Sequence, residues 1–289
     1  MTVHQLHTLH DRSFDAYRYV YPVLSRRSGG MSVGVNLNPD KVCNFDCIYC
    51  QVDRREQSET RFVGMEVLLT ELRELLMCVA SGEIFETKHF RNTPAPLRRL
   101  NDLAFSGDGE PTTYKNFDAI IEACAEVKRS LELDKVKMVL ITNASMFHRR
   151  HVERGLEILD ANQGEIWAKL DAGTDDYYHL IERTPIPFQQ ILDNILTAAK
   201  KRPLVIQSLW MRVDGEGPSD HELSSFCDRL NAIIAGGGKL SLVQTYTIAR
   251  RPAESSVSPL TDIEVDAITR LVQDQVGVPT SSFYGSADY

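Results

Sequence analysis

Residues Lys41–Gln51 read K-V-C-N-F-D-C-I-Y-C-Q, and three of these eleven residues are cysteines. Cys43, Cys47 and Cys50 stand in a C-x3-C-x2-C pattern. Thiolates are soft ligands that suit iron–sulfur clusters, and a [4Fe–4S] cluster ordinarily takes four cysteines. Because the remaining cysteines are scattered singly along the chain, the pattern predicts a cluster with three protein ligands and one iron open to a further ligand.

Two simpler interpretations of the cysteine loop stay open at this point. A structural zinc site needs a fourth ligand, and the nearest histidines, His10 and His89, lie far from the loop in the sequence. A disulfide leaves one of the three cysteines unpaired. The spacing therefore favours a cluster over both.

The cysteine pattern, with the aromatic residue Tyr49 just before Cys50, resembles the signature of the radical S-adenosylmethionine superfamily. The resemblance implies that S-adenosylmethionine (SAM) chelates the open iron through its amino and carboxylate groups, with Tyr49 beside the adenine. It implies that the reduced cluster splits SAM to a 5′-deoxyadenosyl radical, which takes hydrogen from a substrate. A reductant such as flavodoxin or ferredoxin is then the expected partner.

The composition is that of a globular protein. The chain has 289 residues, the size of one α/β barrel or of two small domains. Of these residues, 43% are hydrophobic and 25% are charged. The net charge of −8 argues against broad nonspecific binding to nucleic acid or to anionic membranes. With no long apolar run and no apolar signal segment at the N-terminus, we expect a cytoplasmic protein, in which thiols stay reduced.

Hydrophobic periodicity predicts alternating strands and helices. The first strand spans residues 31–37, and Pro39 ends it directly before the cysteine loop. Further strands are expected at 100–105, 137–142, 166–170, 204–210 and 240–246. Helices are expected at 66–79, 117–131, 188–199, around 223–233, and at 262–274.

This alternation predicts an α/β fold, a partial (β/α)6 TIM-like barrel of parallel strands. We place the barrel at residues 29–252, with an N-terminal extension at 1–28. A C-terminal helix and tail at 253–289 are expected to pack on the barrel. The long connection at 81–99 is a candidate lid. The cysteine loop follows the first strand, at the face where parallel barrels carry their active sites.

The second strand runs into S-G-D-G-E-P-T-T, which begins at Ser106. Its two glycines allow a sharp turn or a close approach to a ligand, and its glutamate can accept hydrogen bonds from an ammonium group. A plain glycine-rich turn is an equal alternative for the segment alone. The position resembles the superfamily's "GGE" motif, which holds the methionine amino group, although Asp108 is an extra residue. The resemblance places four residues at the methionine end of SAM: Gly107, Gly109, Glu110 and Pro111.

Polar residues near the ends of the later strands complete the expected site: Asn143, Lys169, Asp171, Gln207 and Gln244. Asp171 or Asn143 is expected to bind the ribose or the carboxylate of SAM. Lys169 is expected to bind the methionine carboxylate or the substrate, and Gln207 is counted with the cofactor residues. Each of them is also a residue type that commonly stabilises loops.

Several stretches together resemble the branch of the superfamily related to wyosine tRNA-base synthases. They are S-R-R-S-G-G-M-S-V-G-V-N, the cysteine loop, F-S-G-D-G-E-P-T, K-L-D-A-G and A-R-R-P-A-E. Wyosine-forming enzymes carry a second set of cysteines for another cluster. Here residues 1–42 contain no cysteine and none follows Cys227, so that activity is not expected.

The leading hypothesis is a single-cluster radical enzyme with an unidentified substrate. Arginine pairs follow the cysteine loop or a strand end, which weakly favours an anionic substrate such as an RNA base, a nucleotide or a metabolite. The pairs are Arg54–Arg55, Arg149–Arg150 and Arg250–Arg251. The alternatives are a glycyl-radical activase with a protein partner, and an iron–sulfur or zinc module without radical chemistry. The second glycine-rich motif argues against the plain module.

Overall fold

The computed structural model describes residues 17–52, 62–252 and 254–285, and it divides into two compact units. Unit 1 comprises residues 1–43, 56–141 and 149–165. Unit 2 comprises residues 44–55, 142–148 and 166–289. The division falls inside the cysteine loop, because Cys43 belongs to unit 1 whereas Cys47 and Cys50 belong to unit 2. The boundaries expected at residues 28 and 252 stay a prediction.

The strands of unit 1 lie in the order β1-β2-β3-β4. β1 (Val20–Ser25) pairs antiparallel with β2 (Gly30–Val35), while β2, β3 (Leu100–Phe105) and β4 (Lys137–Thr142) run parallel. Both β2 and the second half of β3 are buried on both faces, as in a parallel sheet covered by other layers.

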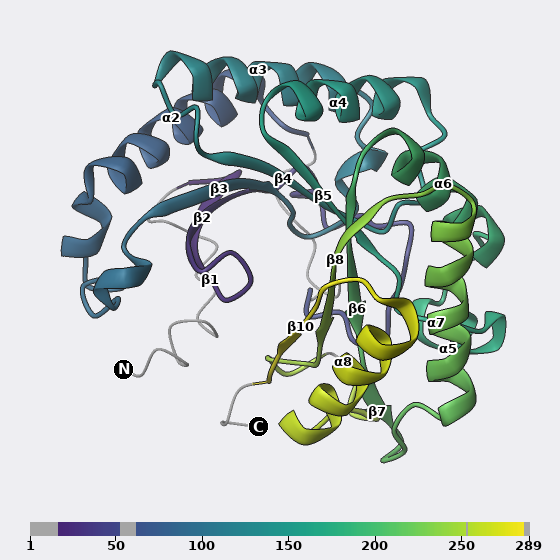
Figure 1. The fold of residues 1–289 in the computed structure, drawn as a ribbon. Coiled ribbons are helices and arrows are strands. Elements are labelled where there is room, and N and C mark those ends of the chain that lie inside the picture. The colour runs from purple at the N-terminus through teal and green to yellow at the C-terminus, as the bar shows by residue number, and fades with distance from the viewer. Residues whose placement is uncertain (1–16, 53–61, 253, 286–289) are drawn as a thin grey trace. The chain divides into compact units, whose positions relative to one another are not determined.

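Among the described residues of unit 1, three helices pack beside these strands, and Figure 1 shows them as one layer. They are α2 (Met65–Ser81), α3 (Phe117–Ser130) and α4 (Arg150–Ala161). α2 buries leucines at helical spacing and ends at Gly82, whose φ of 87° suits a left-handed helix cap. The connection to β3 forms two short 3-10 turns, η1 (Glu83–Glu86) and η2 (Ala95–Leu97), and its use as a lid stays a prediction.

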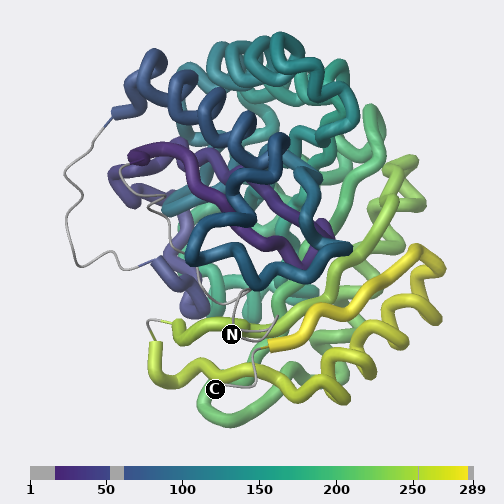
Figure 2. Tube along the Cα trace, turned by 90° about the vertical axis from the view of Figure 1, so that its left-hand side faces the viewer, coloured from purple at the N-terminus to yellow at the C-terminus, as the bar shows by residue number. Residues whose placement is uncertain are grey.

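In unit 2, the strands of the larger sheet lie in the order β5-β6-β8-β10 and are all parallel. They are β5 (Gly164–Lys169), whose first two residues fall in unit 1, β6 (Leu204–Leu209), β8 (Leu240–Tyr246) and β10 (Thr280–Phe283). The helices of this unit are α5 (Asp175–Glu182), α6 (Phe188–Lys201), α7 (Asp220–Ala235) and α8 (Asp262–Val276). Figure 2 shows α8 running beside β10, to which it connects.

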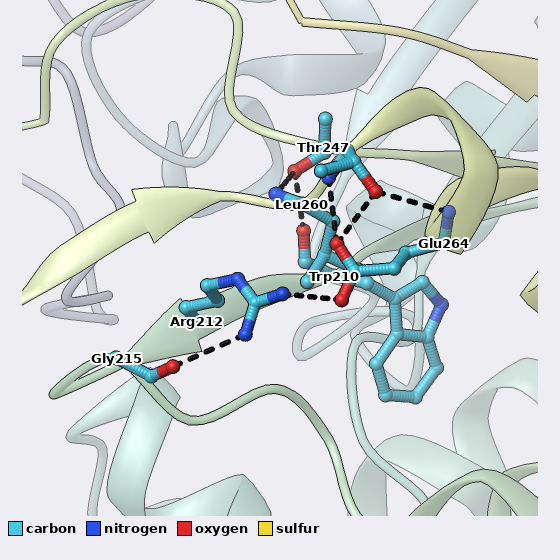
Figure 3. A network of polar contacts seen from close by, with 7 residues as sticks. Trp210, Arg212, Gly215, Thr247, Leu260 and Glu264 are labelled. Atoms are coloured by element: carbon cyan, nitrogen blue, oxygen red, sulfur yellow. Dashed lines mark hydrogen bonds and ion pairs between the residues drawn. The ribbon is translucent and has the colours of Figure 1, made fainter.

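A small antiparallel pair, β7 (Met211–Val213) and β9 (Val257–Pro259), follows the ends of β6 and β8. Figure 3 shows the polar network beside it. The Thr247 hydroxyl donates to the Trp210 carbonyl at 2.8 Å and accepts from the Leu260 amide at 2.8 Å. Arg212 pairs with Glu264, which also completes a capping box at the start of α8. These contacts fix the ends of β6 and β8.

The expected strands and helices are present, most of them within two residues of the predicted bounds. The periodicity did not predict α4, α5, β1 or β10. Both helices are rich in charged residues, and β1 and β10 lie at the ends of the strand order, where burial is incomplete in β10. Among the described residues, no helix is both long enough and apolar enough to span a membrane.

Candidate functional site

In unit 1, the glycine-rich turn lies directly against the base of the cysteine loop. A Cβ atom added to Gly109 would lie 2.1 Å from the Val42 carbonyl oxygen and 2.7 Å from the Asn38 Cβ. A Cβ added to Gly107 would lie 2.3 Å from the Asn36 Oδ1. Since such distances are far below van der Waals contact, only glycine fits at either position.

Asn36 follows β2 directly, and its side chain joins the glycine-rich turn to the segment that leads to Cys43. Its Oδ1 accepts from the amides of Asn38 and Asp108, at 3.0 and 3.2 Å. Its Nδ2 donates to the Asp108 carboxylate at 2.6 Å. The side chain thus satisfies backbone donors from both the turn and the segment that leads to Cys43.

Glu110 is 3% exposed and caps the short 3-10 helix η3 (Pro111–Thr113). Its Oε1 accepts from the amide and the hydroxyl of Thr112, at 3.1 and 2.5 Å. The carboxylate is therefore held in one orientation. Asn38 adds a second acceptor in this part of unit 1, because its Oδ1 is buried and has no hydrogen-bond partner among the described residues.

In unit 2, the cysteine loop is bound to the C-terminal end of α5. The amides of Asp46 and Ile48 donate to the carbonyls of Glu182 and Ile181, at 3.1 and 2.9 Å. The Thr184 hydroxyl donates to the Asn44 carbonyl at 3.0 Å. The first two bonds satisfy carbonyls that the end of a helix leaves free, and all three fix the backbone around Cys47.

The Tyr49 hydroxyl is the centre of a buried polar cluster. It lies 2.5 Å from the Asp171 Oδ2 and 3.1 Å from the Glu182 Oε1, and it accepts from the Lys169 ammonium at 2.7 Å. Lys169 also lies 3.3 Å from the Asp171 carboxylate and 4.4 Å from the centre of the Tyr49 ring. The Cys47 thiol donates to the Glu182 Oε2 at 2.6 Å.

Burial and charge set the protonation of this cluster. Burial raises the pKa of the Cys47 thiol well above its usual value, and the Glu182 charge adds to the effect. Burial, followed by the charge of Asp171, likewise raises the pKa of Tyr49 well above its usual value and that of Glu182 to about 8. Burial alone would lower the pKa of Lys169, but the charge of Asp171 and its neighbours raises it. A metal that binds Cys47 would therefore have to displace this proton.

Asn143 and Gln207 differ in what they contact. Asn143 donates to the Asn44 Oδ1 at 2.9 Å, and its own Oδ1 accepts from the Ser145 amide at 3.1 Å, so it stabilises the loop beside the cysteines. Gln207 lies inside β6 and not at its end, and donates to Gln244 at 2.9 Å.

The arginine pairs are described in part. Arg54–Arg55 lies outside the described residues. Arg149–Arg150 is exposed in unit 1, at the start of α4. In unit 2, the Arg250 carbonyl accepts from the Gln51 side chain at 3.1 Å, and Arg251 is exposed.

Sequence reasoning missed Glu182, Asn36 and Asn38. Glu182 and Cys47 are 135 residues apart, and no motif spacing relates them. Asn36 ends one of the stretches that carried the family resemblance, which was a usable signal. Asn38 follows it by two residues, directly before Pro39.

The donor chemistry of this region fits an iron–sulfur cluster and SAM. All three loop cysteines are of intermediate exposure. Among the described residues, no three His, Cys, Asp or Glu side chains already converge as a metal site, so the fit rests on the donors themselves. Three soft thiols suit a cluster, and the unpartnered Asn38 oxygen with the Glu110 carboxylate suits an ammonium group.

Replacing Glu182 with leucine is expected to lower the free energy of unfolding by about 1–3 kcal/mol, because it removes a buried partner of both Cys47 and Tyr49. Urea denaturation of the metal-free protein measures this. The exposed Glu216→Gln variant is the control and should change stability by less than about 0.5 kcal/mol. Equal stability of the Glu182 variant and the wild type would show that these bonds do not hold the loop.

This chain is similar to known proteins both in sequence and in fold. A protein named GTPase Obg, from Brachyspira hyodysenteriae, is 26% identical over 253 residues, which is 85% of this chain and 32% of that protein. The chain thus spans about a third of that relative.

Two solved structures share the fold. A radical SAM methyltransferase from Sphaerobacter thermophilus aligns with a TM-score of 0.61 at 12% identity, covering 94% of this chain and 71% of that one. A TYW1 with a bound lysine-pyruvate adduct aligns with a TM-score of 0.50 at 16% identity, covering 94% and 80%. The predicted α/β partial barrel is confirmed, and the second neighbour is the wyosine synthase whose branch the motifs resemble.

The family model of the Radical SAM superfamily matches residues 37–223, a span that runs from the segment before the cysteine loop into α7. This match covers more than half of the chain and includes the glycine-rich turn and the polar cluster around Tyr49. The protein is therefore a member of the Radical SAM superfamily.

Proposed function

We propose that this protein is a radical SAM enzyme that uses one [4Fe–4S] cluster, held by Cys43, Cys47 and Cys50. When bound, the cluster supplies the electron that cleaves SAM to a 5′-deoxyadenosyl radical, which abstracts hydrogen from the substrate. The observation that carries the proposal is the set of three cysteines in C-x3-C-x2-C spacing in one loop of a chain of this superfamily. Membership of the superfamily favours an enzyme over a plain metal-binding module.

The residues of unit 1 are proposed to bind the methionine end of SAM. The Asn38 Oδ1 and the Glu110 carboxylate accept hydrogen bonds from its ammonium group. Gly107 and Gly109 keep the turn close to the chain, and Pro111 starts the short helix that Glu110 caps. Because Glu110 is already oriented by Thr112, it needs no rearrangement to receive a cation.

The residues of unit 2 are proposed to hold the rest of SAM and the cluster loop. Tyr49 is placed beside the adenine, and Asp171 or Asn143 binds the ribose or the carboxylate. Lys169 and Gln207 are available to the carboxylate or to the substrate. Glu182 positions Cys47 through its carboxylate and its main-chain carbonyl, which accepts from Asp46.

The electron donor and the location complete the proposal. Reductive cleavage requires a one-electron reductant, and a flavodoxin or ferredoxin of the cytoplasm is proposed for that role. The substrate is an RNA base, a nucleotide or another metabolite. Metal analysis of protein reconstituted without oxygen is the first test: four irons and four sulfides per chain support the proposal, and one zinc without sulfide contradicts it.

Replacing Glu110 with glutamine is expected to leave the iron content unchanged and to weaken SAM binding by about 10- to 100-fold. The reason is that a hydrogen bond to a charged group is worth about 1.5–3 kcal/mol. Equilibrium dialysis of SAM against the cluster-loaded protein measures the loss. The exposed Glu86→Gln variant is the matched control and should bind SAM as the wild type does. Unchanged affinity of the Glu110 variant would remove this residue from the site.

A further inference from the structure

The four parallel strands of unit 2, β5, β6, β8 and β10, have one face that α8 covers and one that it does not. Thr245 of β8 and Ser282 of β10 both hydrogen-bond to Thr269 of α8, so their side of the sheet is the covered face. Side chains alternate between faces along a strand, and residues paired in register share a face. Gln244 and Ser281, which pair with each other, therefore lie on the face turned away from α8.

A row of polar residues crosses this second face. The strand register pairs Lys169 with Gln207, Gln207 with Gln244, and Gln244 with Ser281. Gln207 and Gln244 are 0% and 1% exposed. Because the interior of barrels of parallel strands is ordinarily filled with branched apolar side chains, a buried pair of amides is not what core packing requires.

Gln207 is only half satisfied. Its Nε2 donates to the Gln244 Oε1 at 2.9 Å, but its own Oε1 is buried and has no hydrogen-bond partner among the described residues. A buried amide oxygen without a partner costs about 1–3 kcal/mol. A bound molecule that donates an N–H to this oxygen removes the cost.

The charges along this row of polar residues favour a ligand group without charge. Lys169 is the cation of the row, and the Asp171 carboxylate at 3.3 Å already neutralises it. A buried anionic ligand would need a protein cation that is not already paired. The row as described offers no cation beyond the one in this ion pair. The Lys169 ammonium has three hydrogens, and with Tyr49 and Asp171 as partners it can still donate to a carbonyl oxygen.

We propose that Lys169, Gln207 and Gln244 form a substrate subsite for a neutral amide group, either a carboxamide or a lactam. The amide N–H binds the Gln207 Oε1, and the amide carbonyl binds the Lys169 Nζ. The inference rests on the proposed function, since the bound molecule is a substrate only if the protein performs SAM chemistry. It assigns Lys169 and Gln207 to the substrate and narrows the substrate class from anions to molecules that carry an uncharged amide.

Three probes that differ only at the amide test the subsite. Benzamide offers a donor and an acceptor, N,N-dimethylbenzamide lacks the donor, and benzoate carries a negative charge. Their dissociation constants are measured by saturation-transfer NMR on the cluster-loaded protein with SAM, without oxygen. Benzamide is expected to bind at least tenfold more tightly than the other two. The Gln207→Met variant, which keeps the side-chain volume, should lose this preference.

Ser208→Ala is the matched control, because Ser208 is the next residue of β6 and pairs with Thr245 on the face that α8 covers. It should bind benzamide as the wild type does. If Gln207→Met does not fold, Gln207→Leu serves instead and should also lose benzamide binding, because leucine likewise lacks the acceptor oxygen. Equal binding of the three probes, no binding of benzamide to the wild type, or its retention by the Gln207 variant would overturn the inference.

The assay separates this inference from the proposed function. Formation of 5′-deoxyadenosine without selective benzamide binding would overturn the subsite alone. Selective binding that depends on Gln207, in a protein that does not cleave SAM, would overturn the enzymatic proposal and leave an amide-binding site.

Discussion

Replacing Cys47 with alanine is expected to abolish cluster assembly, with less than about a tenth of the wild-type iron retained after reconstitution. Only three protein thiolates are available to the cluster in this account, so the loss of one leaves too few ligands to hold it. Iron and sulfide analysis measures the loss, and so does the visible absorbance of the cluster. SAM cleavage should disappear together with the iron.

The matched control for Cys47 is Cys78→Ala. Cys78 is a free cysteine of intermediate exposure on α2, and none of the motifs includes it. This variant should retain the full iron content. Iron at the wild-type level in the Cys47 variant would mean that the loop does not hold the cluster, and equal loss in both variants would mean that the loss reflects the number of thiols and not their place.

Replacing Gly109 with alanine is expected to damage the cysteine loop without removing a thiol. The new Cβ would lie 2.1 Å from the Val42 carbonyl oxygen, which belongs to the backbone directly before Cys43. Backbone cannot move aside as the end of a flexible side chain can, so the chain around Cys43 has to shift. Overpacking of this kind costs about 1–3 kcal/mol. The midpoint temperature of thermal unfolding and the iron content should both be lower than in the wild type.

Gly217→Ala tests whether any added methyl group has this effect. The nearest atom to a Cβ at this position is in the Leu260 side chain at 3.8 Å, an ordinary van der Waals distance. The variant should therefore keep the stability and the iron content of the wild type. Normal iron loading in the Gly109 variant would show that the glycine-rich turn does not support the cysteine loop.

Local patterns predicted the elements whose signal lies within one segment. The buried strand at 137–142 and the amphipathic helix at 117–131 both appear within one residue of the expected bounds. The loop at 41–51 was identified from ligand chemistry and spacing, which are likewise local. Helix α5 was not predicted, because it has only eight residues and half of its first turn is charged.

Contacts between distant segments could not be predicted from one sequence. The main-chain bonds that join Asp46 and Ile48 to the end of α5 leave no trace in either segment's residue types. The unpartnered oxygens of Asn38 and Gln207 depend on what surrounds each side chain after folding. Gln207 was expected to lie at the end of a strand. The strand register instead places this residue inside β6, where it pairs with Lys169 of β5 and Gln244 of β8.

Formation of 5′-deoxyadenosine distinguishes a radical SAM enzyme from a protein that only holds a cluster. The protein is reconstituted without oxygen, reduced with dithionite in the presence of SAM, and the products are analysed by mass spectrometry. We expect 5′-deoxyadenosine from the wild type and from Cys78→Ala, and none from the single alanine variants of Cys43, Cys47 or Cys50. The same yield from the three loop variants as from the wild type would contradict this expectation.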